Sequence, residues 1–104
     1  MELNIDNLKD DYIVTKSINC VAYLLLFCNK DKVDIVECED GLNVFIVKKT
    51  EDLFRAYKTY KYRTINCLAI RVDDLQLYNN NIKYIKQMLR EYKNRRYEMR
   101  REEL

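Results

Sequence analysis

Hydrophobic and polar residues follow different periods in different parts of the chain, and these periods predict its first elements. Residues 12–15 (YIVT) are β-branched or aromatic and predict a short strand. Ser17 can then act as an N-cap for the run from Cys20 to Cys28, which is nine residues long and has no charge. A transmembrane helix needs about 20 apolar residues. The run therefore predicts a helix buried on most sides, in a protein that does not cross the membrane.

Two β-rich segments further along the chain predict a hairpin. These are residues 33–38 (VDIVEC) and 42–47 (LNVFIV), and the tripeptide 39–41 (EDG) separates them. An Asp-Gly pair between two such segments is a strong hairpin signal, because glycine accepts the positive φ of the turn.

Two helices are predicted after the hairpin. Thr50 caps the first, whose acidic first turn suits the helix dipole and which is expected to end near Tyr60. Asp73 or Asp74 caps the second, which runs through at least Tyr92 and on toward residue 101.

The segment between these helices predicts another strand. Residues 65–72 (INCLAIRV) are apolar on both alternating faces, with a short buried helix as the alternative. The predicted order is β-α-β-β-α-β-α, an α+β fold with a ferredoxin-like or related antiparallel sheet and a long C-terminal helix. We expect a single domain over residues 1–104, with a polar lead-in (1–11), a folded core (12–93) and a projecting basic helical tail (94–104).

Charge is distributed unevenly along the 104 residues, although the formal net charge is only +2. Residues 1–54 hold 6 Lys against 11 Asp and Glu, whereas residues 55–104 hold 13 Lys and Arg against 6 Asp and Glu. Such a basic half can meet nucleic acid or an acidic protein, or it can be a solvated surface. It can also match the acidic half, within one chain or between two copies associated head to tail.

The residue types present argue against catalysis and bound cofactors. The chain has no His to serve as a base or metal ligand, one Ser and one Gly, so neither a nucleophile–base pair nor a phosphate loop is expected. Its four cysteines form no C-x-x-C pair, and the acidic N-terminus is unlike a secretory signal. We therefore expect a non-enzymatic, cytoplasmic protein with reduced, mostly buried thiols and no metal or other cofactor.

The first candidate binding segment is residues 54–63 (FRAYKTYKYR), in which cations and tyrosines alternate. Cations neutralise phosphates and aromatic rings stack on unpaired bases, so this mixture suits nucleic acid, although an ordinary amphipathic helix end has the same pattern. The candidate residues are Arg55, Tyr57, Lys58, Tyr60, Lys61, Tyr62 and Arg63.

The terminal helix is the second candidate, because it carries an apolar row and a basic row. The apolar seam is Leu75, Tyr78, Ile82, Ile85, Leu89 and Tyr92, and it can either cover the domain's own sheet or pair with a second copy in a homodimer. The basic candidates are Lys83, Lys86, Arg90, Lys93, Arg95, Arg96 and Arg100. Arg96 interrupts the seam, so the end of the helix is expected to project from the domain.

The chain resembles a family of short proteins from phages, prophages and other mobile elements of low-GC Gram-positive bacteria, which carry a domain of unknown function. The resemblance spans residues 11–93 and rests on the segments 11–25 (DYIVTKSINCVAYLL), 42–57 (LNVFIVKKTEDLFRAY) and 82–93 (IKYIKQMLREYK). Residues 27–29 (FCN) stand where members of that family usually carry a glycine. The resemblance implies an accessory role in phage biology and assigns no functional residue.

Together these observations predict a phage accessory protein, acting in the host cytoplasm, that binds a macromolecule through its basic C-terminal half. Nucleic acid is the favoured partner. The alternatives are a host protein, in which case the chain inhibits a bacterial defence system, and a small ligand that the chain sequesters. No interaction with membranes is expected, because the basic helix lacks a bulky apolar face.

Overall fold

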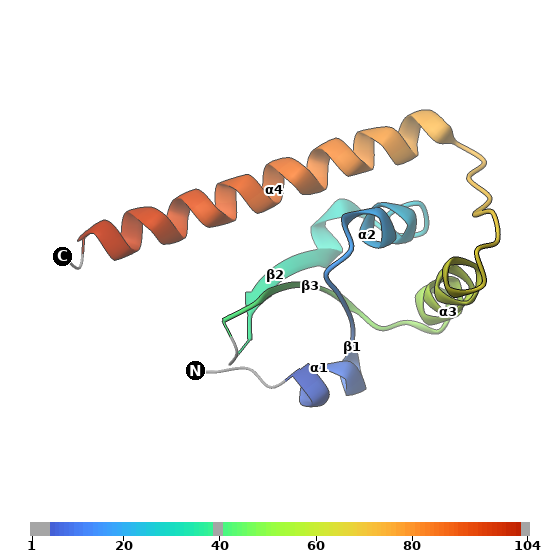
Figure 1. Ribbon diagram of the computed structural model, residues 1–104, viewed down its shortest axis with the longest axis horizontal. Coiled ribbons are helices and arrows are strands. Elements are labelled where there is room, and N and C mark those ends of the chain that lie inside the picture. Colours follow the sequence, from blue (N-terminus) through green and yellow to red (C-terminus); the bar gives the residue numbers. More distant parts are fainter. Residues whose placement is uncertain (1–4, 39–40, 103–104) are drawn as a thin grey trace.

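A computed structural model describes the backbone of residues 5–38 and 41–102, and the side chains of residues 8–38 and 41–98. The elements, in chain order, are α1 (Ile5–Asp11), β1 (Tyr12–Thr15), α2 (Ile18–Leu24), the 3-10 turn η1 (Lys30–Lys32), β2 (Val33–Glu37), β3 (Asn43–Lys48), α3 (Glu51–Ile65) and α4 (Leu75–Glu102). The predicted α+β class with a long C-terminal helix is confirmed (Figure 1). The polar lead-in expected over residues 1–11 contains the helix α1.

The three strands form one antiparallel sheet in the order β1-β3-β2. The predicted strands β1, β2 and β3 all form, and the hairpin between β2 and β3 closes where it was expected. Its turn has Gly41 at φ +82°, a left-handed conformation that glycine adopts without a steric penalty. Glu39 and Asp40 of the predicted turn lie outside the described residues.

The helix α2 forms the centre of the core. The hydroxyl oxygen of Ser17 accepts a hydrogen bond from the backbone N–H of Cys20 at 3.1 Å, which confirms the predicted N-cap. The helix ends at Leu24, before the predicted end at Cys28, and every residue from Cys20 to Leu25 is buried. Burying one leucine side chain contributes about 1.5–3 kcal/mol, so this short helix supplies much of the hydrophobic stabilisation.

The helix α3 begins as predicted and ends later. The hydroxyl of Thr50 caps it by accepting from the N–H of Leu53 at 3.2 Å, and the helix continues five residues past the predicted end at Tyr60, to Ile65. Two residues past this end, Cys67 has a φ of 55°.

The predicted strand over residues 65–72 does not form, so the order β-α-β-β-α-β-α is wrong, and the sheet of the described residues has three strands instead of four. Ile65 ends α3 and the residues after it form an irregular link to α4. The left-handed Cys67 reverses the chain, and the side chain of Arg63 donates to the carbonyl oxygen of Ala69 at 3.0 Å. Ile65 and Leu68 are exposed, so the apolar pattern of this segment does not mark a buried strand.

The core has two parts, one on each face of the sheet. The larger part joins α2 to the sheet, to Leu53 of α3 and to Ile85 of α4. The smaller part lies on the other face and contains Cys38, Val44 and Ile46.

The helix α4 crosses the domain along α2, and its C-terminal end extends past the sheet (Figure 1). The carboxylate of Asp74 accepts from the N–H of Leu77 at 2.9 Å, which confirms the predicted capping in this region. The helix continues through residues 94–102, which were expected to form a projecting tail. Arg96 of this part forms an ion pair with Glu37 of β2, so the tail is not wholly free of the domain.

Candidate nucleic-acid interface

The helix α4 carries a row of four exposed cations, which we term the basic stripe: Lys83, Lys86, Arg90 and Lys93. They recur at steps of three and four residues, so at 100° per residue they lie within a sector of about 80°. The centre of this sector is about 100° from the apolar seam of the same helix. One side of α4 therefore faces the core and a neighbouring side presents positive charge to solvent.

No acidic side chain neutralises the basic stripe within the described part of the chain, where the ion pairs involve only Arg55, Arg71 and Arg96. Arg90 donates to the amide oxygen of Gln87 at 3.0 Å, a neutral partner. Glu91 and Glu98 lie on the other flank of the helix, about 100–120° from the stripe's centre. The positive charges of the stripe are thus left to interact with an external anion.

Tyr97 extends the basic stripe and was not among the residues predicted from the sequence. It lies four residues beyond Lys93, at the centre of the same sector, and its side chain is 66% exposed. The stripe from Lys83 to Tyr97 is about 21 Å long at 1.5 Å per residue. The spacing of three and four residues continues to this tyrosine, and that continuation is the signal that could have identified it.

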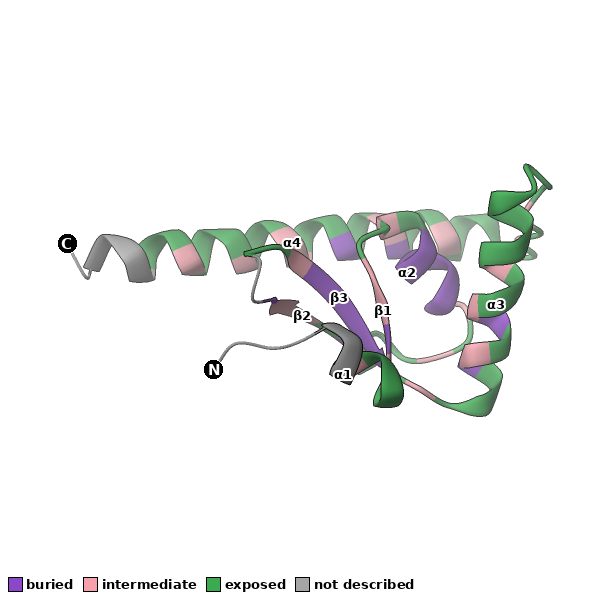
Figure 2. Ribbon diagram, turned by 60° about the horizontal axis from the view of Figure 1, so that its bottom comes forward, coloured by how far each residue is buried: buried purple, intermediate pink, exposed green. Residues whose placement is uncertain are grey.

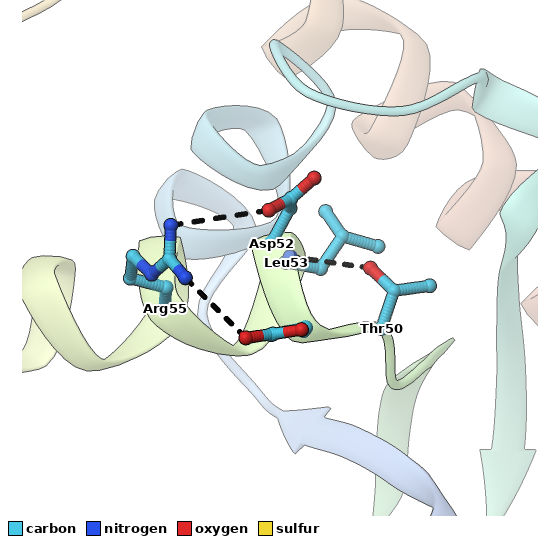
Figure 3. Close-up of polar contacts among 5 residues, drawn as sticks. Thr50, Asp52, Leu53 and Arg55 are labelled. Atoms are coloured by element: carbon cyan, nitrogen blue, oxygen red, sulfur yellow. Dashed lines mark hydrogen bonds and ion pairs between the residues drawn. The ribbon is translucent and has the colours of Figure 1, made fainter.

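The cations of α3 are engaged within the molecule. Arg55 contacts the carboxylates of Glu51 and Asp52 at 3.5 and 4.0 Å, as the dashed lines of Figure 3 show. The ammonium groups of Lys58 and Lys61 lie 4.7 and 5.4 Å from the ring centres of Phe54 and Tyr57. The predicted cations of this segment therefore already have partners, including Arg63, whose bond to Ala69 holds the link to α4.

Two of the three predicted stacking tyrosines are part of the core packing. Tyr57 and Tyr60 are half-buried against the main cluster, and the rings of Tyr60 and Tyr23 are 5.3 Å apart between centres. Tyr62 is 65% exposed and is the one of the three that is open to a partner. This arrangement favours the amphipathic-helix interpretation for most of residues 54–63.

The predicted candidates fall on two separate surfaces. The helix α2 packs against both α3 and α4 and lies between them (Figure 1). The tyrosines of α3 and the basic stripe of α4 therefore do not form one continuous interface. Of the two, the stripe is the surface whose cations have neither an ion pair nor an aromatic contact with a described residue.

The apolar seam of α4 faces the domain's own core. Ile85 is fully buried, and Tyr78, Ile82, Leu89 and Tyr92 are half-buried, whereas Leu75 is 63% exposed. Of the two interpretations of the seam, this packing favours the intramolecular cover over a dimer contact.

The three remaining basic candidates of α4 differ in their surroundings. Arg96 forms an ion pair with Glu37 of β2 and donates to the hydroxyl of Tyr92 at 3.3 Å. The hydrogen bond with Glu37 raises the pKa of Arg96, so the guanidinium remains charged at all working pH values. Arg95 is exposed but lies outside the sector of the stripe, and the side chain of Arg100 lies outside the described residues.

The cysteines show no sign of activation. Burial raises the pKa of Cys20 to about 11, and burial also raises the pKa of Cys28. Cys67 is exposed, and Cys38 is buried in the smaller cluster. Among the residues that the structure describes, no group of three His, Cys, Asp or Glu side chains is placed to hold a metal ion.

No helix in the described part of the chain combines the length and the apolar composition needed to span a membrane. Comparisons with protein-family models, with curated proteins and with solved structures found no match to this chain. The resemblance to the phage family therefore stays a prediction from the sequence.

Proposed function

We propose that the protein is a non-enzymatic accessory protein of a phage or mobile element that binds nucleic acid through the basic stripe of α4. The observation that carries the proposal is the row of four exposed cations without acidic partners among the described residues. Cations held in a row on a rigid helix can neutralise successive phosphates and release the counterions condensed on them. Tyr97 at the end of the row offers an exposed ring for contact with a base or sugar.

This mode of binding depends on phosphate charge and not on base sequence. Contacts to phosphates position a protein on nucleic acid but carry no sequence information, and the stripe consists mainly of phosphate-binding residues. We therefore expect similar affinities for unrelated sequences of the same length and strandedness.

The test is a salt titration of binding to a fluorescent DNA duplex of about 20 base pairs, an equivalent single strand and an RNA. If four phosphates are contacted in the duplex, the logarithm of the affinity falls with a slope of about −3.6 against the logarithm of the salt concentration. Affinity then falls about a hundredfold between ~50 and ~200 mM salt. Absence of binding to all three probes at low salt contradicts the proposal.

A matched pair of variants separates the stripe from the net charge of the protein. The stripe variant replaces Lys83, Lys86, Arg90 and Lys93 by Gln, and the control variant replaces Lys9, Lys16, Lys32 and Lys48, which are exposed elsewhere. Both lose four positive charges. We expect the stripe variant to lose most of the salt dependence and the control to retain it, and equal losses in the two would contradict a defined interface.

A second candidate function is inhibition of a host defence protein through the same end of α4. The exposed Tyr97 beside Lys93 favours it, because tyrosines with basic neighbours often supply much of the binding energy of protein interfaces. The test measures binding to a purified defence protein. Binding that persists after nuclease treatment, at high salt and in the variant with the four stripe substitutions, but is lost in Tyr97→Ala, would support this candidate over nucleic acid.

A further inference from the structure

The strand β1 is an edge of the sheet, and its outer side faces α3. Sheet order β1-β3-β2 gives β1 one strand neighbour, β3, on its inner side. Figures 1 and 2 both place α3 beyond the opposite side of β1. The outer edge of β1 is therefore a row of backbone groups next to a helix and not next to another strand.

The hydrogen-bonding register identifies the backbone groups on this outer edge. The N–H of Lys49 donates to the carbonyl oxygen of Asp11 at 2.9 Å, so Asp11 directs its backbone groups toward β3. Successive residues of a strand direct their backbone groups to alternate edges. The N–H and C=O groups of Val14 and the C=O group of Tyr12 consequently point outward, where no strand in the described part of the chain pairs with them. The N–H of Tyr12 closes the last turn of α1, which ends at Asp11.

A groove runs along this edge, between β1 and α3. It consists of two adjoining hollows of about 420 and 300 Å³ that share Val14, Tyr57 and Lys61 in their walls. Phe54 lines one end of this β1–α3 groove and Ile65, which is 73% exposed, lines the other. The helix thus presents apolar and aromatic side chains to whatever lies against the strand.

The charged residues around the β1–α3 groove are all lysines. Lys9, Lys16, Lys49 and Lys61 line it, and no carboxylate does. The ammonium groups of Lys49 and Lys61 lie over the rings of Phe54 and Tyr57, and Lys49 also donates to the carbonyl oxygen of Lys9, but none of the four lysines forms an ion pair with a described residue. Lysines on an open edge oppose pairing with a second copy, which would bring the same lysines together. The same lysines favour an acidic segment by charge complementarity.

We infer that the β1–α3 groove receives an extended segment of a partner protein, in which apolar residues alternate with Asp or Glu, as a fourth strand of the sheet. The outward backbone groups of Tyr12 and Val14 supply the main-chain hydrogen bonds of this strand addition. The aromatic wall of α3 contacts the apolar side chains, and the lysines contact the acidic ones. This surface is separate from the basic stripe, so the inference does not depend on nucleic-acid binding.

The first step of the test is a selection of random twelve-residue peptides, displayed on particles, against the full chain. We expect enrichment of sequences that alternate β-branched or aromatic residues with Asp or Glu. Hydrogen exchange then shows which amides the enriched peptide covers, once it has been synthesised. The N–H of Val14 should exchange at least about tenfold more slowly in its presence. Enrichment of no sequence, or of basic or helical peptides, overturns the inference.

Chemical and mutational controls isolate strand addition. Methylation of alternate backbone nitrogens of the peptide removes the donors that face β1 and should weaken binding at least tenfold, with no change to the protein. Val14→Pro removes the outward N–H at an edge position that tolerates proline, and Lys61→Glu reverses a groove charge. Both should weaken binding, whereas Lys86→Glu on α4 makes the same charge change and should not.

Three results identify a different occupant and overturn the inference. The first is equal binding of the methylated and unmethylated peptides. The second is a concentration-dependent dimer, seen by sedimentation, that Lys61→Glu strengthens or Val14→Pro abolishes. The third is slowed exchange of the Val14 amide by an oligonucleotide in place of a peptide. If Val14→Pro melts at a markedly lower temperature than the wild type, its loss of binding is not informative. The comparison of methylated and unmethylated peptides, which uses the wild-type protein, then provides the test of strand addition.

Discussion

The side-chain amide of Asn81 in α4 donates a hydrogen bond of 3.2 Å to the carbonyl oxygen of Ala22 in α2. Asn81 is fully buried, and Ala22 lies in the last turns of its helix. The N–H of Leu26, which would reach this oxygen if α2 continued, instead donates to Tyr23. Carbonyls at a helix end need other partners when they are buried. Asn81 supplies one from another helix, and so fixes the position of α2 against α4.

The first prediction concerns this bond. Asn81→Ala leaves the buried oxygen of Ala22 without a partner, which costs about 1–3 kcal/mol of unfolding free energy. Urea denaturation measures the loss, with Asn80→Ala as the control, since Asn80 is the exposed neighbour on the same helix. A similar small loss in both variants would show that Asn81 does not hold the two helices together.

The end of α3 has a left-handed residue that is not glycine. Cys67 has a φ of 55°, its N–H donates to Thr64 at 3.2 Å, and the N–H of Leu68 donates to Arg63 at 2.7 Å. These two bonds are the Schellman pattern of helix termination, in which glycine is the usual residue at the left-handed position. An L-residue there is disfavoured by roughly 1–2 kcal/mol relative to its right-handed conformation.

The second prediction follows from this strain. Cys67→Gly relieves it, and the greater freedom of glycine in the unfolded chain offsets part of the gain, so the unfolding free energy rises by up to about 1 kcal/mol. Cys67→Ala is the control, because it removes the thiol and keeps the Cβ atom responsible for the strain. The measurement is again urea denaturation, and equal stability of the two variants would contradict the prediction.

The same residue explains why one element could not be predicted from the sequence. The pattern of residues 65–72 is apolar on both alternating faces, which is typical of a buried strand. The helix of α3 nevertheless extends into this segment, and its end is marked by a cysteine where glycine would have been a recognisable signal. Ile65 is exposed because it ends α3 and adds no strand to the sheet, a placement that follows from tertiary structure and not from the local pattern.

The sites could be predicted where they depend on local periodicity. The caps at Ser17 and Thr50 and the position of the basic stripe follow from residue types and from the helical repeat. The separation of α3 from α4 by α2 could not be predicted, because it depends on how the helices pack. Asn81 was missed for a similar reason: its position on the seam was visible, but its partner is 59 residues away in the sequence.

The third prediction concerns the ion pair between Arg96 and Glu37, which joins α4 to β2. Arg96→Gln should release this part of the helix, so that the amides of residues 94–98 exchange hydrogen several-fold faster. Glu37→Gln should have the same effect, and the double variant should exchange no faster than either single one. Arg95→Gln is the control, because Arg95 is exposed and forms no ion pair with a described residue. Unchanged exchange in Arg96→Gln would show that packing alone holds the helix.

The last prediction uses the thiol of Cys20, which belongs to the main core cluster. Burial raises its pKa from 9.0 to about 11, while the Thr15 hydroxyl and the Lys61 charge oppose the rise. The folded state therefore keeps the proton that the unfolded state loses between these two pH values. The contribution of Cys20 to stability is complete below pH 9 and declines as the pH rises toward 11.

The corresponding measurement compares the unfolding free energies of the wild type and of Cys20→Ala at several alkaline pH values. The difference between them should shrink by about 2–3 kcal/mol across this range, since one pKa unit corresponds to about 1.4 kcal/mol. Other groups titrate in both proteins and cancel in the difference. Val21→Ala is the control: Val21 belongs to the same core cluster but has no ionisable group, so its difference from the wild type should stay constant with pH. A Cys20→Ala difference that stays constant with pH would mean that the thiol ionises in the folded protein as readily as in the unfolded chain.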